Sequence, residues 1–265
     1  MLRSSLNRVH DELATTPEAR EAFSHMVIIG HSMGGLLTKT LLQDPGDILV
    51  RKVTGKPWAE VEKQCTPEQK KMFEDIVLYK SVPFVRRVLF LAVPHRGANM
   101  ANYSQVRTLA RLIELPADLV KEATGAMKTL SLKKDGVPVF ETRIKNGLEE
   151  LSPKVPTLWA IDVIPLRPDV PRHSIIGSNR KDTPGGSDGV VEYSSSHRDD
   201  VRSELVVRSG HSVQTNPVAI YEVRRILLEH LKEEKICDSK QLSPAPHANA
   251  EKPASRKDAP AAARQ

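Results

Sequence analysis

The chain has 265 residues and a formal net charge of +6, with 39% hydrophobic, 27% charged and 4% aromatic residues. This length and balance suit one globular α/β domain with a sizeable core. The basic residues are scattered among acidic ones, aromatic residues are scarce and no nucleic-acid-binding module is recognisable, so we expect no nucleic-acid partner.

The sequence contains no apolar run near the roughly 18 residues of a membrane span, and its N-terminus has no apolar signal-peptide core. We therefore expect no transmembrane segment and, by default, a cytoplasmic location. Cys65 and Cys237 lie far apart and outside any metal-ligand spacing, which favours two free thiols over a disulfide.

The first half of the chain predicts a helix, a strand and a second helix in succession. Residues 2–23 have an amphipathic pattern that breaks near Pro17, where a new helix would begin. Residues 26–30 form a continuous apolar run, typical of a parallel strand that is buried on both faces. A helix is predicted over 34–42, and a peripheral helical insertion over 47–82.

The rest of the chain predicts three further strands, over 87–93, 173–177 and 204–207, and a closing helix over 217–232. Between the first two of these strands, residues 95–156 are helix-rich. Their apolar stripes fit either core-packing helices or a cap over a substrate cleft. Residues 239–265 are rich in Ala, Pro and Lys and poor in apolar side chains, so we expect a disordered tail after a domain that spans 1–238.

The pattern G-x-S-x-G follows the first strand and leads into a helix, which is the context of a nucleophile elbow. Ser32 would occupy a strained turn, with Gly30 and Gly34 avoiding collisions. His31 lies in the same motif but is expected to point in another direction, and Met33 would offer its N–H to a developing oxyanion. The alternative is that the glycines only allow close packing of strand and helix.

A serine becomes a strong nucleophile when a histidine takes its proton and a carboxylate orients that histidine. In this kind of fold the chain order is serine, acid, histidine, each after a strand. His211 follows the strand 204–207 and precedes the last helix, so it is the predicted base, with His197 as the rival. Asp188 is the predicted acid, in a glycine-rich loop after the strand 173–177, with Asp182 as the runner-up.

Five segments resemble the bacterial lipase and esterase branch of the α/β-hydrolase superfamily: VIIGHSMGGLL, VLFLAVPHRG, HSIIG, GGSDGVVEYSSSH and ELVVRSGHS. The resemblance spans roughly residues 26–231. It implies an α/β-hydrolase-type, mostly parallel sheet with flanking helices. It also implies a triad of Ser32, His211 and Asp188 that acts through an acyl-enzyme on a small ester or lipid, with Met33 as an oxyanion donor and no cofactor.

Some lipases of this branch bind a structural calcium ion near the acid loop. We find no convincing second carboxylate for such a site, and the stretch at Asp199 and Asp200 is expected to be a solvated surface. No metal is therefore expected.

One departure from the superfamily concerns the start of the sheet. The elbow usually follows about the fifth of eight strands, whereas here it follows the first recognisable one. The resemblance then implies an N-terminally truncated sheet, without the loop that supplies the second oxyanion donor, whose loss costs about 100- to 1000-fold in rate. The first strand would have an open apolar edge through which chains could self-associate.

Two classes of function remain at this point. The first is a serine carboxylic-ester hydrolase, within which thioesterase, amidase and phospholipase activities would use the same triad. The second is a non-catalytic or weakly active fragment or binding module that lacks a complete oxyanion hole.

Overall fold

The computed structural model describes residues 2–98, 133–134, 137–138, 161–180 and 185–236. The chain divides into two units, Met1–Arg225 and Ile226–Gln265, and the sheet and the site below belong to the first. Most of the predicted insertion over 95–156, the predicted tail over 239–265 and the runner-up acid Asp182 lie outside the described residues.

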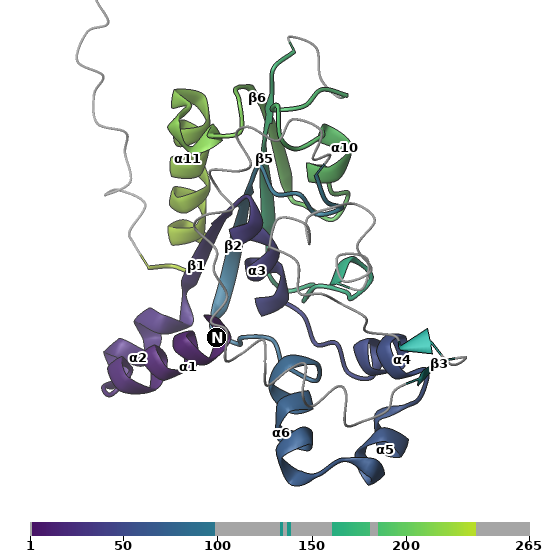
Figure 1. Cartoon of the computed structure of the whole chain (residues 1–265). Helices are drawn as coiled ribbons and strands as arrows, with labels where there is room; N and C mark the ends of the chain where they lie inside the picture. Colours follow the sequence, from purple (N-terminus) through teal and green to yellow (C-terminus); the bar gives the residue numbers. More distant parts are fainter. Residues whose placement is uncertain (1, 99–132, 135–136, 139–160, 181–184, 237–265) are drawn as a thin grey trace, which may run out of the picture. The chain divides into compact units, whose positions relative to one another are not determined.

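A four-stranded parallel sheet lies at the centre of the first unit, in the order β1-β2-β5-β6 (Figure 1). Its strands are β1 (Met26–His31), β2 (Val85–Leu91), β5 (Arg172–Ser178) and β6 (Ser203–Arg208). All four confirm the strands predicted from the apolar runs. Because the strands are parallel, the segments that follow β1, β5 and β6 all begin at the carboxyl end of the sheet.

The helices that flank the sheet also follow the sequence pattern. Thr16 accepts a hydrogen bond from the N–H of Ala19 (3.2 Å), and Pro17 occupies the first turn of the helix that begins there. These two residues explain the predicted break in the N-terminal helix. The helices are α1 (Leu2–Leu13), α2 (Pro17–Ser24), α3 (Met33–Leu41), α10 (Tyr193–Ser196), η3 (Val213–Thr215) and α11 (Pro217–Glu233).

The core is divided between the two faces of the sheet. On one face Phe90 and Ile28 pack with Leu36 of α3. On the other face Leu91 packs with Ala219, which lies in the first turn of α11. Each fully buried aliphatic or aromatic side chain contributes about 1.5–3 kcal/mol, so this packing fixes both helices against the carboxyl ends of the strands.

The predicted insertion over 47–82 is helical, as expected. Its elements are α4 (Ile48–Thr54), α5 (Trp58–Val61), η1 (Glu62–Gln64) and α6 (Pro67–Ile76). A reciprocal pair of hydrogen bonds between Thr66 and Gln69 caps the start of α6. The insertion has a small core of its own, formed by Val50, Val61 and Phe73. A separate pair of short strands, β3 (Lys133–Lys134) and β4 (Val137–Pro138), is antiparallel.

β1 is the end strand of the sheet as far as the structure describes it. It carries no acidic residue, lysine or arginine, and its Ile29 side chain is 43% exposed. The expected burial of this strand on both faces is therefore wrong, because it has a described neighbour on one side only. Charged side chains commonly protect such an edge from pairing with another chain. Self-association through β1 therefore stays a prediction.

Two smaller expectations can be compared with the structure. Cys65 is a free thiol, whereas Cys237 lies outside the described residues. Within the described ranges, every helix is too short or too polar to cross a bilayer.

Candidate active site

Ser32 lies in the single-residue turn between the end of β1 and the start of α3. Its backbone is left-handed, with φ 52° and ψ −130°, a conformation that costs a non-glycine residue about 1–3 kcal/mol. The N–H of Ser32 donates to the carbonyl oxygen of Leu91 at 2.9 Å, which holds the turn against the end of β2. The strand, turn and helix predicted from the sequence are therefore present around this serine.

Two of the three glycines near Ser32 are required by close packing. A Cβ atom at Gly30 would lie 2.6 Å from the Cα atom of Gly35, and one at Gly35 would lie 2.1 Å from Cγ2 of Val93. At Gly34 a Cβ atom would meet nothing within 4 Å among the residues that the structure describes. The collision expected at Gly34 is thus wrong, because these residues leave open space at that position. The crowded helix position is the next residue, Gly35.

Replacing Gly35 by alanine should destabilise the protein, whereas the same change at Gly34 should not. The new methyl group at Gly35 would overlap buried Val93, and overpacking typically costs about 1–3 kcal/mol. At Gly34 an alanine should leave stability unchanged or raise it by up to about 1 kcal/mol through helix propensity. Urea unfolding of both variants measures the difference, and equal effects would contradict the packing described here.

His211 lies in the loop between β6 and η3, and its ring contacts the serine. Its Nε2 atom is 2.8 Å from Oγ of Ser32. The two residues are 179 positions apart in the chain. The parallel sheet brings them together because β1 and β6 both have their carboxyl ends on the same side of it.

Asp188 completes a chain of three side chains. Its Oδ2 atom is 2.8 Å from Nδ1 of His211. Its other oxygen, Oδ1, accepts hydrogen bonds from the N–H groups of Val190 (2.8 Å) and Val191 (2.7 Å). The residue is only 4% exposed, so these bonds compensate the cost of burying the carboxylate. The loop thus fixes which oxygen faces the histidine.

A glycine that sequence reasoning missed lets the loops that carry Asp188 and His211 approach each other. A Cβ atom at Gly177, near the end of β5, would lie 2.8 Å from Cγ1 of Val213, 2.9 Å from Cβ of Asp188 and 2.9 Å from the carbonyl oxygen of Gly210. The sequence signal was a glycine that ends an apolar strand directly before the acid loop.

The rival base, His197, has partners of its own. Its Nδ1 atom is 2.7 Å from Glu204 and its Nε2 atom is 3.1 Å from Asp199, while its ring stacks on Tyr193. The hydrogen bond to Glu204 raises the pKa of His197 above its ordinary value, against the opposing effect of burial. His197 therefore contacts two carboxylates, whereas the histidine that contacts Ser32 is His211.

His95 is a buried histidine whose ring packs edge-on against Phe90, with centroids 4.8 Å apart. Burial, with the nearby charge of Arg198 as the next cause, lowers the pKa of His95 well below its ordinary value. Neither of its ring nitrogens has a partner among the described residues. This side chain is an uncharged part of the core.

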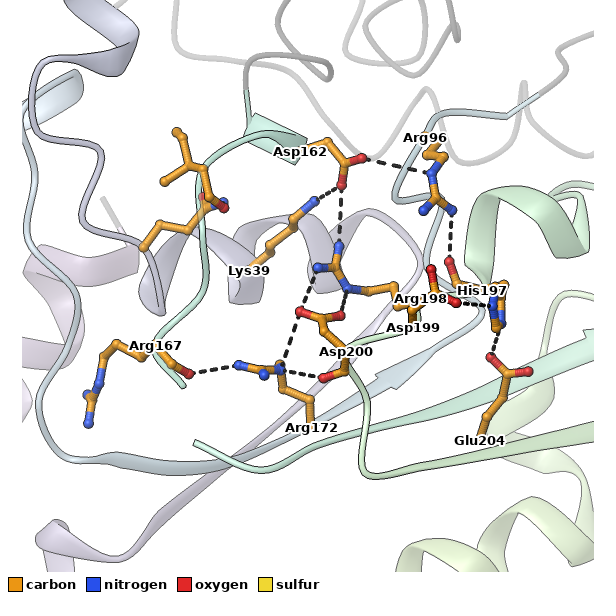
Figure 2. A network of polar contacts seen from close by, with 12 residues as sticks. Lys39, Arg96, Asp162, Arg167, Arg172, His197, Arg198, Asp199, Asp200 and Glu204 are labelled. Atoms are coloured by element: carbon orange, nitrogen blue, oxygen red, sulfur yellow. Dashed lines mark hydrogen bonds and ion pairs between the residues drawn. The ribbon is translucent and has the colours of Figure 1, made fainter. Parts of the chain in front are cut away.

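A partly buried network of ion pairs includes Lys39 of α3 (Figure 2). The ammonium group of Lys39, which is fully buried, donates to Oδ1 of Asp162. Arg198 and Arg96 approach the same carboxylate, at 3.3 Å and 3.8 Å. Burial lowers the pKa of Lys39 to about 8, although the hydrogen bond to Asp162 acts in the opposite direction. The network ties α3 to the segments that carry Asp162 and Arg198.

Asp200 extends this network towards the sheet. It accepts two hydrogen bonds from Arg198, at 2.7 Å and 2.9 Å, and its carbonyl oxygen accepts one from Arg172 at 3.0 Å (Figure 2). The expected solvated surface is present at this point, because the side chains of Asp199 and Asp200 are 93% and 40% exposed. Asp200 differs from Asp199 in that it also pairs with two arginines.

Within the ranges that the structure describes, no three His, Cys, Asp or Glu side chains gather in a way that could hold a metal ion.

Comparison with known proteins gives similarity at the level of structure alone. No protein-family model matches the chain, and no curated protein sequence matches it significantly. Among solved structures, the mature form of Bacillus licheniformis lipase BlEst2 shares 13% sequence identity and a TM-score of 0.41, over 85% of this chain and 71% of the lipase. The propeptide form of the same lipase shares 14% identity and a TM-score of 0.38, over 84% and 39%. Staphylococcus hyicus lipase shares 17% identity and a TM-score of 0.42, over 79% and 71%.

Proposed function

We propose that the protein is a serine hydrolase that cleaves carboxylic esters through an acyl-enzyme, with Ser32 as nucleophile, His211 as base and Asp188 as orienting acid. One observation carries the proposal. The imidazole of His211 lies 2.8 Å from Oγ of Ser32 on one side and 2.8 Å from the carboxylate of Asp188 on the other. This is the arrangement that makes a serine hydroxyl reactive.

The first step is attack of Ser32 on the ester carbonyl. As the bond from Oγ to the carbonyl carbon forms, the hydroxyl proton moves to Nε2 of His211, and the Nδ1–H of the ring stays bonded to Asp188. The tetrahedral adduct then collapses, the bond to the alkoxy oxygen breaks, and the imidazolium gives its proton to that oxygen, which leaves as the alcohol. Water repeats the sequence on the acyl-enzyme, which releases the acid and restores Ser32.

The start of α3 provides the donor for the developing oxyanion. The N–H of Gly35 is already bonded to the carbonyl oxygen of Ser32 at 2.9 Å. The N–H groups of Met33 and Gly34 precede it in the first turn, and the structure gives them no acceptor among the residues it describes. Together with the helix dipole, they favour negative charge next to Ser32. Met33, which directly follows the serine, is the proposed oxyanion donor.

Labelling with a fluorophosphonate tests the proposal directly, because the probe reacts with a serine that an adjacent base activates. The folded protein should be labelled at Ser32, as identified by mass spectrometry of its peptides, and should hydrolyse a short nitrophenyl ester. Heat-denatured protein is the control and should not react. A folded protein that takes no label, or that is labelled at another serine, would remove the proposal.

The alternative is a binding module that retains the three side chains without useful activity. It is favoured by the position of β1 at the end of the described sheet, because no described strand beyond it carries a second oxyanion donor. A binding module whose serine is not activated would leave the probe unreacted, so the same experiment separates the two functions.

A further inference from the structure

His31 occupies the first variable position of the G-x-S-x-G motif, and its side chain contacts the base loop. The Nε2 atom of His31 is 2.9 Å from the main-chain carbonyl oxygen of His211. The two imidazole rings lie with centroids 5.0 Å apart at an angle of 46°. The residue before the nucleophile is therefore bonded to the residue that supplies the base.

This contact determines which ring nitrogen of His31 carries a proton. A carbonyl oxygen only accepts hydrogen bonds, so Nε2 must carry a proton. Burial is the largest influence on this ring and lowers the pKa of His31, while the hydrogen bond to His211 and the charge of Asp188 act in the other direction. At neutral pH the ring is then uncharged, with its single proton on Nε2. A neutral ring adds no positive charge beside the imidazolium that forms on His211 during the reaction.

The hydrogen bond closes a short loop of contacts around the reacting atoms. Oγ of Ser32 bonds the ring of His211, the main chain of His211 bonds the ring of His31, and His31 is joined to Ser32 by a peptide bond. Among the described residues, no other hydrogen bond reaches the main chain of His211. Asp188 orients the side chain of His211, whereas His31 bonds the backbone from which that side chain projects.

We infer that His31 is a positioning residue that holds the backbone of His211 so that its Nε2 atom stays within reach of Ser32. This inference rests on the proposed function and adds a fourth member to the site. Its effect should fall on the chemical step, because a base displaced by about 1 Å can slow a reaction about 100-fold, whereas His31 has no proposed contact with bound substrate.

Three variants separate the hydrogen bond from the packing of the ring. His31→Gln places an amide N–H near the original Nε2 position and should keep kcat within about threefold of the original protein. His31→Phe keeps an aromatic ring but has no donor, and should lower kcat by about 10- to 100-fold with KM nearly unchanged. His31→Asn is polar and compact but too short to reach the carbonyl oxygen, so it should behave like His31→Phe, and it serves if the phenylalanine does not fold.

A spectroscopic measurement makes the inference independent of activity. The Nδ1 proton of His211, held in its charge-assisted bond to Asp188, should give a far-downfield proton resonance in the nuclear magnetic resonance spectrum. We expect this resonance in the original protein and in His31→Gln, and its loss or broadening in His31→Phe and His31→Asn. Thermal unfolding shows whether each variant is folded.

The inference is overturned if folded His31→Phe or His31→Asn keeps both the downfield resonance and, where the original protein is active, its kcat. It is equally overturned if His31→Gln loses both, because the donor would then not be what matters. A protein that never hydrolyses an ester but follows the expected pattern of resonances would refute the proposed function and leave the role of His31 standing.

Discussion

Ser32→Ala should abolish ester hydrolysis, with a fall in kcat on the order of a million-fold, as when the nucleophile of a coupled triad is removed. The methyl group leaves His211 without a hydroxyl to deprotonate, and the acyl-enzyme cannot form. The substitution removes one oxygen atom and keeps a Cβ atom in the same left-handed turn, so the protein should remain folded. Steady-state hydrolysis of a nitrophenyl ester, with thermal unfolding in parallel, measures both effects.

The matched control for this variant is Ser24→Ala, which removes the hydroxyl group of a half-buried serine at the end of α2, where it donates to the carbonyl oxygen of Glu21. It should leave kcat unchanged. If Ser32→Ala retained more than about one hundredth of the original kcat, where removal of a nucleophile predicts a near-total loss, the observed hydrolysis would come from another group and Ser32 would not be the nucleophile.

Asp188→Asn should lower kcat by about ten-thousand-fold with little change in stability. The reason is that the two carboxylate oxygens have different partners: Oδ1 faces the main chain and Oδ2 faces His211. Oδ1 accepts two main-chain N–H groups, so the amide oxygen of asparagine must take that position and the amide NH₂ group must face His211. The ring can then only accept a hydrogen bond at Nδ1, which moves its proton to Nε2. In this tautomer the histidine donates to Ser32 and cannot take its proton.

Stability should change by no more than about 1 kcal/mol, because the main-chain hydrogen bonds of the loop survive. Asp199→Asn makes the same chemical change on a side chain that is 93% exposed, and it should keep full activity. Asp188→Asn with kcat within tenfold of the original would show that the carboxylate does not set the tautomer of His211.

The parts of the site that depend on local pattern could be predicted from the sequence. The strand that runs into the elbow is a continuous apolar segment, and the chain order of serine, acid and histidine selects Asp188 and His211 by their places after β5 and β6. The four strands of the parallel sheet were predictable for the same reason, since each is a short apolar run between loops.

The contacts that depend on packing between distant segments could not be predicted. The choice of Gly35 over Gly34 as the crowded position is set by Val93, more than fifty residues further along the chain. The need for glycine at Gly177 and the hydrogen bond from His31 to His211 arise because segments that follow different strands meet at the carboxyl end of the sheet. The hydrogen bond that the main chain of Asp200 accepts from Arg172 likewise joins residues 28 positions apart. No sequence pattern encodes which side chain a neighbouring strand will present.

The left-handed backbone at Ser32 has a consequence for how this molecule can change. Glycine adopts φ 52° without the steric conflict that serine meets there, so the turn would be more stable if its reactive side chain were removed. Selection for stability alone would therefore tend to erase the hydroxyl group. If the proposed activity is correct, the serine persists at this position against the preference of its own backbone, and the sheet and α3 must together hold it there.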